Sequence, residues 1–168
     1  GILARAAPAV LVDGWLTPDD RRDADVRSGR VENSGRHHQA GAMSFKIPVS
    51  ILALVYTRDL SVLLIERADF PGYWQSVTGS QEPGEPLAAT AARELGEETG
   101  IDAGAWGGLA DWNLSQVYEI YPQWRHRYPP GTTHNTEHVF ALELPSPVVV
   151  ALAPREHRAA LWVPWREA

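Results

Sequence analysis

The chain of 168 residues contains no cysteine, which excludes a disulfide framework and a thiolate metal site. No apolar run is long enough to cross a bilayer, and the first residues lack the charged-then-apolar pattern of a signal peptide. Acidic residues outnumber basic ones, and the net charge of −6 disfavours binding to a nucleic acid polymer. These absences predict a soluble, cytoplasmic protein that binds neither nucleic acid nor membrane.

What is present suffices for one hydrophobic core, since 44% of the residues are hydrophobic and 21% are charged. Residues 1–42 differ from the rest, with scattered charges and little periodicity, and are predicted to be a disordered or non-native N-terminal extension. Their His37-His38 pair is more typical of exposed histidines than of a metal site. The only methionine, Met43, precedes the patterned sequence, so we expect the domain to span residues 43–168.

The patterned part predicts many strands and one helix. Strands are expected at residues 47–56, 62–66, 73–78, 114–121, 136–144, 148–152 and 160–165. A helix is expected between Glu85-Pro86, which suit a first turn, and Gly100, which suits a C-terminal stop. One helix among many strands predicts an α+β fold with a mixed sheet, and not a regular βαβ alternation.

Three acidic residues gather on one face of the predicted helix. Because a helix advances about 100° per residue, Glu94, Glu97 and Glu98 fall within roughly 100° of arc. They also lie near the negative end of the helix dipole, so a positive partner is expected against them. Carboxylates without cysteine or paired histidine favour Mg²⁺, with Mn²⁺ as an alternative. Taken alone, such a run is also typical of a solvated acidic helix face.

The spacing around these acids resembles the Nudix hydrolase signature at every fixed position. Five residues separate Gly79 from Glu85, seven more lead to Arg93-Glu94, and an aliphatic residue, Glu97-Glu98, Gly100 and Ile101 follow. The resemblance implies an α/β/α sandwich with a loop–helix–loop motif and a diphosphatase activity. That fold normally closes with a C-terminal helix, which we expect to be missing because the chain stops soon after its last predicted strand.

Runs outside the motif are similar to the bacterial dihydroneopterin triphosphate pyrophosphatases. They begin at Phe45, Leu63, Trp124 and Arg155, and the similarity covers about residues 45–165. It implies Mg²⁺-dependent conversion of 7,8-dihydroneopterin triphosphate to the monophosphate and pyrophosphate, a step toward folate. Two alternatives stay open: a pyrophosphatase that cleans the nucleotide pool of (d)NTPs, and a non-catalytic module that senses a nucleotide.

The resemblance also implies the metal and catalytic residues. Glu94, Glu97, Glu98 and Glu156 are expected to bind metal, and Glu97 and Glu98 are expected to be catalytic, with the identity of the general base left open. Glu94 and Glu98, one helical turn apart, can share a divalent ion.

Other charged residues have simpler interpretations. Arg93 is expected to be structural and to pair with an acid of the motif such as Glu85. Glu156 matches a remote family carboxylate, although an acid beside Arg155 and Arg158 is also typical of a surface ion pair.

Substrate contacts implied by the resemblance are Lys46, Arg67, Thr78, Tyr118, Glu119, Ile120 and Tyr121. The ammonium of Lys46, the only lysine, suits phosphate, and the fork of Arg67 can bind phosphate oxygens in pairs. Residues 118–121 match the family segment around the pterin, a flat ring that favours aromatic stacking, but core aromatics in a strand would look the same. The expected partner is a small-molecule triphosphate, pterin or nucleotide, and the oligomeric state is left open.

Overall fold

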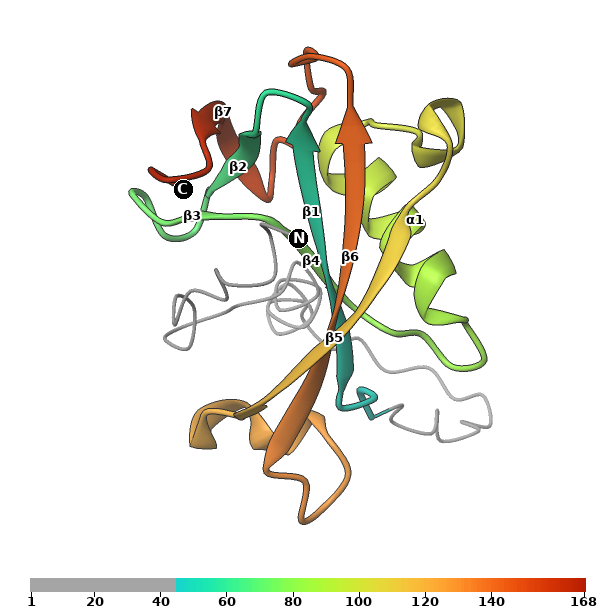
Figure 1. Cartoon of the computed structure of the whole chain (residues 1–168). Coiled ribbons are helices and arrows are strands. Elements are labelled where there is room, and N and C mark those ends of the chain that lie inside the picture. The colour runs from blue at the N-terminus through green and yellow to red at the C-terminus, as the bar shows by residue number, and fades with distance from the viewer. Residues whose placement is uncertain (1–44) are drawn as a thin grey trace, which may run out of the picture. The chain divides into compact units, whose positions relative to one another are not determined.

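The structure, a computed structural model, describes residues 45–168, which form one sheet and a small number of helices (Figure 1). The strands are β1 (Val49–Thr57), β2 (Ser61–Arg67), β3 (Trp74–Gln75), β4 (Val77–Ser80), β5 (Ala110–Glu119), β6 (His134–Leu144) and β7 (His157–Pro164). The helices are α1 (Leu87–Thr99) and the short 3₁₀ helices η4 (Ala103–Trp106) and η5 (Pro122–Arg127). The predictions for residues 1–42, for the histidine pair in them and for Met43 lie outside the described residues.

The seven strands make a mixed sheet in the order β3-β2-β1-β6-β5, with β4 paired to β1 and β7 paired to β2. β1 is parallel to β6 over the whole length of β1, and the remaining pairs are antiparallel. The predicted α+β class with a mixed sheet is therefore confirmed. In residues 45–168 no helix is long and apolar enough to span a membrane.

Helix α1 begins and ends where its sequence predicts. Pro86 is the N-cap residue, with the fixed φ of −65° that suits this position. Gly100 ends the helix in the left-handed conformation at φ 71°, and its N–H donates to the carbonyl of Gly96 at 2.9 Å. These two residues set the length of the segment that presents the motif acids.

The core lies between the sheet and α1, which covers one face of the sheet (Figure 1). Alternate residues of β1 point to this face, among them Ile51 and Val55, and they pack with Leu142 of β6 and Leu95 of α1. Because side chains alternate along a strand, the residues between them point to the opposite face. The described residues contain one α-helix, so in this part of the chain that opposite face carries no helical layer.

Two strand predictions need correction. Residues 73–78 form two short strands, β3 and β4, that pair with different partners, and not one continuous strand. Residues 148–152 form no strand: the N–H of Ala151 donates to the carbonyl of Thr99 at 2.8 Å, at the end of α1. The side chains of Val148, Val150 and Leu152 pack against the core. The apolar pattern reflects burial over the helix end, which periodicity alone does not separate from strand pairing.

Candidate active site

The loop that leads into α1 is held by one arginine. Arg93 Nε donates to Oε1 of Glu85 at 2.9 Å, and Nη2 donates to Oε2 at 3.0 Å. The same Nη2 also donates to the carbonyl of Ser80 at 3.2 Å. The hydrogen bonds from Arg93 lower the pKa of Glu85 to about 2. The predicted structural pair is confirmed, and it fixes the loop against the helix.

Gly79 is required because the side chain of Glu94 occupies the space beside it. A Cβ atom at this position would lie 2.0 Å from the Cδ atom of Glu94, far inside van der Waals contact. Gly79 therefore permits β4 and α1 to approach closely, with a buried carboxylate between them.

Two of the three motif acids contact Arg93. Glu94 is buried, and its Oε1 lies 2.8 Å from Nη1 of Arg93. Burial raises the pKa of Glu94 to about 8, although Arg93 acts in the opposite direction. Glu97 lies on the exposed side of the helix, with Oε2 3.3 Å from the same Nη1 atom.

The third motif acid belongs to a separate buried group, here called the Glu98 site, made of Glu98, Glu156 and His157. Glu98 is completely buried, and its Oε2 lies 3.4 Å from Nε2 of His157. Each of the three residues offers a ligand atom, and these atoms lie within 4.8 Å of one another. Burial, and then the charge of Glu156, raises the pKa of Glu98 well above its usual range.

The Glu98 site fits a divalent cation. Both carboxylate oxygens of Glu98 are buried, and no side chain of the described residues donates a hydrogen bond of ordinary geometry to them, which is costly for a buried charge. Two ligand atoms at about 2.1 Å from one ion lie roughly 3.0–3.5 Å apart when adjacent in its coordination shell, which matches the 3.4 Å separation of Glu98 and His157. Two carboxylates and an imidazole suit Mg²⁺ or Mn²⁺, and the nitrogen favours Mn²⁺ relative to an all-oxygen site.

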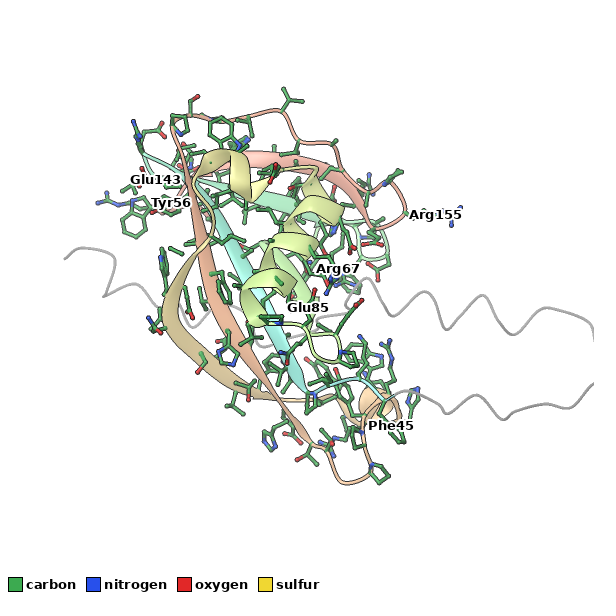
Figure 2. The ribbon with its side chains drawn as sticks, turned by 90° about the vertical axis from the view of Figure 1, so that its right-hand side faces the viewer. Phe45, Tyr56, Arg67, Glu85, Glu143 and Arg155 are labelled. Carbon is green, nitrogen blue, oxygen red and sulfur yellow. The ribbon has the colours of Figure 1, made fainter. Side chains whose placement is uncertain are left out.

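A turn brings Glu156 and His157 to this site together. The N–H groups of both residues donate to the carbonyl of Ala153, at 3.0 and 2.9 Å. Arg158 pairs with Glu66 at 3.3 Å. Arg155 lies at the outer tip of its loop (Figure 2). The carboxylate of Glu156, in contrast, lies beside Glu98.

Comparison with known proteins agrees with this geometry. A family model described as the NUDIX domain matches residues 46–168. The chain belongs to the Nudix family. As a Nudix hydrolase it acts on the diphosphate bond of a small-molecule phosphate substrate, and enzymes of this family use divalent metal ions.

Four curated relatives carry the description dihydroneopterin triphosphate diphosphatase. The dihydroneopterin triphosphate diphosphatase of Escherichia coli (strain K12) is 44% identical over 121 residues, which is 71% of this chain and 79% of that protein. The protein of that description from Haemophilus influenzae is 39% identical over 128 residues, or 75% of this chain and 80% of the relative. A solved structure of E. coli dihydroneopterin triphosphate pyrophosphohydrolase has a TM-score of 0.63 at 44% identity and covers 71% of this chain and 82% of its own.

Arg67 and Thr78 of this Nudix hydrolase are both buried, on β2 and β4. Arg67 lies opposite His157 in the β2–β7 pair and alongside α1 (Figure 2). Its positive charge acts to lower the pKa of Glu98, against the larger effect of burial. Its guanidinium holds both oxygens of Asp69, at 3.0 and 2.8 Å. The hydroxyl of Thr78 has no hydrogen-bond partner among the described residues. Arg67 is therefore adjacent to the Glu98 site, with its fork already occupied by a carboxylate.

The side chains of residues 118–121 of the Nudix hydrolase do not face a common site. Tyr118 is largely buried, whereas the exposed Glu119 pairs with Arg125. Ile120 is buried, and its N–H donates to the carbonyl of Thr133 at 2.8 Å. The ring of Tyr121 packs edge-on against Trp124. Of these four side chains, only Tyr118 joins a buried polar group of the sheet.

The backbone N–H of Lys46 donates to the carbonyl of Arg127 at 2.9 Å, which ties the start of the described chain to η5. The sequence gives no reason to single out His157, although it directly follows Glu156. Strand alternation would direct these neighbours to opposite faces, and only the turn places both beside Glu98.

Proposed function

We propose that this Nudix hydrolase converts 7,8-dihydroneopterin triphosphate to dihydroneopterin monophosphate and pyrophosphate, with Mg²⁺ as the metal, in the cytoplasm. The reaction type is supported by one observation, the Glu98 site at the end of the helix that carries the motif acids. The substrate is inferred from the relatives that carry this description at 44% and 39% identity. The domain that performs the reaction is residues 43–168.

In this proposal one group of residues binds the metal ion, and Glu97 positions the attacking water. Glu98 and Glu156, with His157, would hold a divalent ion, which supplies positive charge to the leaving pyrophosphate and lowers the pKa of a water. Glu97 stands exposed one residue away, where it can orient that water or accept its proton. Arg93 keeps the helix and loop in place during these steps.

A substrate panel tests the proposal. The chain is incubated with Mg²⁺ and either dihydroneopterin triphosphate or each of the four dNTPs, and pyrophosphate release is measured. We expect kcat/KM for the pterin to exceed that for every dNTP by at least about tenfold, a difference of about 1.4 kcal/mol. A higher kcat/KM for a dNTP would assign the enzyme to the nucleotide pool instead. No release from any of the five would contradict the hydrolase assignment and favour a sensing module.

A further inference from the structure

A buried carboxylate lies on the sheet face away from α1, where the Nudix motif does not use it. Glu137, in the middle of β6, is only 2% exposed. Its neighbours along the strand at even positions, such as Phe140 and Leu142, belong to the core against α1. Because side chains alternate in a strand, Glu137 points to the opposite face.

Glu137 has one neutral partner and no counter-ion among residues 45–168. Nε2 of Gln116, from β5, donates to its Oε2 at 2.7 Å. Burial raises the pKa of Glu137, and the hydrogen bond from Gln116 offsets only part of that rise. A buried carboxylate without a cation is costly for a fold, so a role in recognition is a reasonable explanation for it.

Polar groups from three strands surround this carboxylate. Asn135 of β6 donates through Nδ2 to Oγ of Ser50 on β1 at 2.7 Å, and the hydroxyl of Tyr118 on β5 interacts with both. Burial, followed by the charge of Glu137, raises the pKa of Tyr118, which shows that the two side chains are close. We call these residues the Glu137 cluster: Ser50, Gln116, Tyr118, Asn135 and Glu137.

We propose that Glu137 recognises the ring of the substrate through a forked pair of hydrogen bonds from a ring N–H and the adjacent amino group. Two parallel N–H donors are the best partners for a carboxylate. The 2-amino-4-oxo edge of a pterin presents this pair, and so does guanine, whereas adenine does not. The inference rests on the proposed function for the identity of the natural ring, and it makes Glu137 a determinant of specificity.

The register of the sheet places this ring site within reach of the motif loop. Glu137 pairs with Ser50 of β1, and Ser50 pairs with Ser80 of β4, so the three residues form a line across the sheet. Strands lie about 4.8 Å apart, so the Cα atoms of Glu137 and Ser80 are separated by roughly 10 Å. Ser80 is the last residue of β4, and the loop to α1 begins at the next residue. The proposed ring position and the start of the motif loop therefore lie two strands apart in the sheet.

The experiment compares three substrates in the variant Glu137→Gln. It measures kcat/KM for dihydroneopterin triphosphate, dGTP and dATP in the full chain with Mg²⁺. An amide keeps the size of the side chain but replaces one acceptor of the fork with a donor. We expect kcat/KM to fall at least about tenfold for the pterin and for dGTP, mainly through KM, and to stay within about twofold for dATP.

Glu143→Gln is the matched control, because Glu143 lies on the same strand and the same face. Glu143 is exposed at the far end of β6, where it contacts Arg58 at 3.2 Å and Tyr56 (Figure 2). This variant should keep wild-type values for all three substrates. An equal loss on all three substrates in Glu137→Gln, or no loss on any, would overturn the inference in favour of a structural role.

Ring binding without hydrolysis separates this inference from the proposed function. Titration with neopterin, guanosine and adenosine, followed by fluorescence or calorimetry, reports the ring site even if pterin triphosphate is not cleaved. Weaker binding of neopterin and guanosine to Glu137→Gln, with adenosine unchanged, supports the fork. Equal binding of the three ligands to the wild type contradicts it. Thermal unfolding of both variants shows whether each is folded.

Discussion

Glu97 and Glu98 are adjacent in sequence, yet their surroundings give them different chemistry. Glu98 is fully buried beside Glu156 and His157, where a divalent ion would relieve the repulsion of two carboxylates. Glu97 is exposed and pairs with Arg93, which also pairs with Glu85 and Glu94. The buried acid is suited to holding the ion, and the exposed acid is suited to meeting water.

Replacing Glu98 with glutamine should lower kcat by about 100-fold or more, because a ligand is lost while side-chain size is kept. The fold should persist, since the change also removes a buried carboxylate that lies beside Glu156. Pyrophosphate release and thermal unfolding check both points. Turnover close to wild type would remove Glu98 from the catalytic assignment.

Replacing His157 with alanine should weaken Mn²⁺ binding about 10- to 100-fold, whether its nitrogen binds the ion or orients Glu98. Electron paramagnetic resonance of free Mn²⁺ measures this without substrate. His134→Ala, at the exposed start of β6, is the control and should bind Mn²⁺ as the wild type does. Equal affinities in the two variants would show that His157 has no part in the site.

At the scale of elements, the loop–helix unit depends on close approach and on one ion pair. Gly79 lets β4 approach the buried Glu94, and Glu85 with Arg93 ties the loop to α1. Both features come from residues with fixed spacing in the motif. This local origin explains why the bounds of α1 could be predicted from sequence.

Two glycines of the motif should respond to alanine in opposite ways. Gly79→Ala should cost about 1–3 kcal/mol of unfolding free energy and reduce activity, because its Cβ would displace Glu94. Gly96→Ala should stabilise by about 0.5–1 kcal/mol, since its Cβ meets nothing closer than 4.0 Å and alanine favours the helix. Urea unfolding measures both values. A stabilised Gly79→Ala protein would contradict the packing described here.

The Glu85–Arg93 pair should make the free energy of unfolding depend on pH in the acidic range. The pKa of Glu85 is about 2 in the folded chain and 4.5, the ordinary value of a glutamate, in the unfolded chain. The unfolded chain therefore binds the proton more tightly. Its contribution, up to about 3 kcal/mol, is present above pH 4.5 and is lost as the pH falls toward 2. In urea titrations, Glu85→Gln should be less stable at neutral pH and should show a smaller decline in this range. An unchanged decline would contradict the assignment.

At the scale of the whole molecule, the Glu98 site joins α1 to a segment more than fifty residues further along the chain. Glu98 comes from α1, Glu156 from the turn before β7, and His157 from the first position of β7, which pairs with β2. An irregularity in that pairing lies between Glu66 and Arg67, next to the site. Binding of a metal there should therefore stabilise the complete fold and not the motif alone.

Removing metal should accordingly lower Tm. A ligand at 100 times its Kd adds about 2.7 kcal/mol to the folded state if the unfolded chain does not bind it. Calorimetry with Mg²⁺ or Mn²⁺, compared with a chelator, should show a higher Tm with metal. Glu98→Gln should lose most of the shift. Equal shifts in both proteins would indicate that the ion binds elsewhere.

Sequence by itself determined the features whose causes are local. The spacing from Gly79 to Ile101 indicated the family and the bounds of α1, and strand periodicity indicated most of the sheet. It failed at residues 148–152, because burial against a helix end produces the same apolar pattern as a strand.

Only the tertiary structure decided which side chains meet. His157 joins the Glu98 site because the turn at Glu156 leads directly into β7, and Glu137 becomes a buried, uncompensated carboxylate through the pairing of β6 with β1 and β5. Arg67, expected to contact substrate, already holds Asp69. Contacts of this kind depend on strand register and on packing between distant segments, and spacing along the chain carries no information about either.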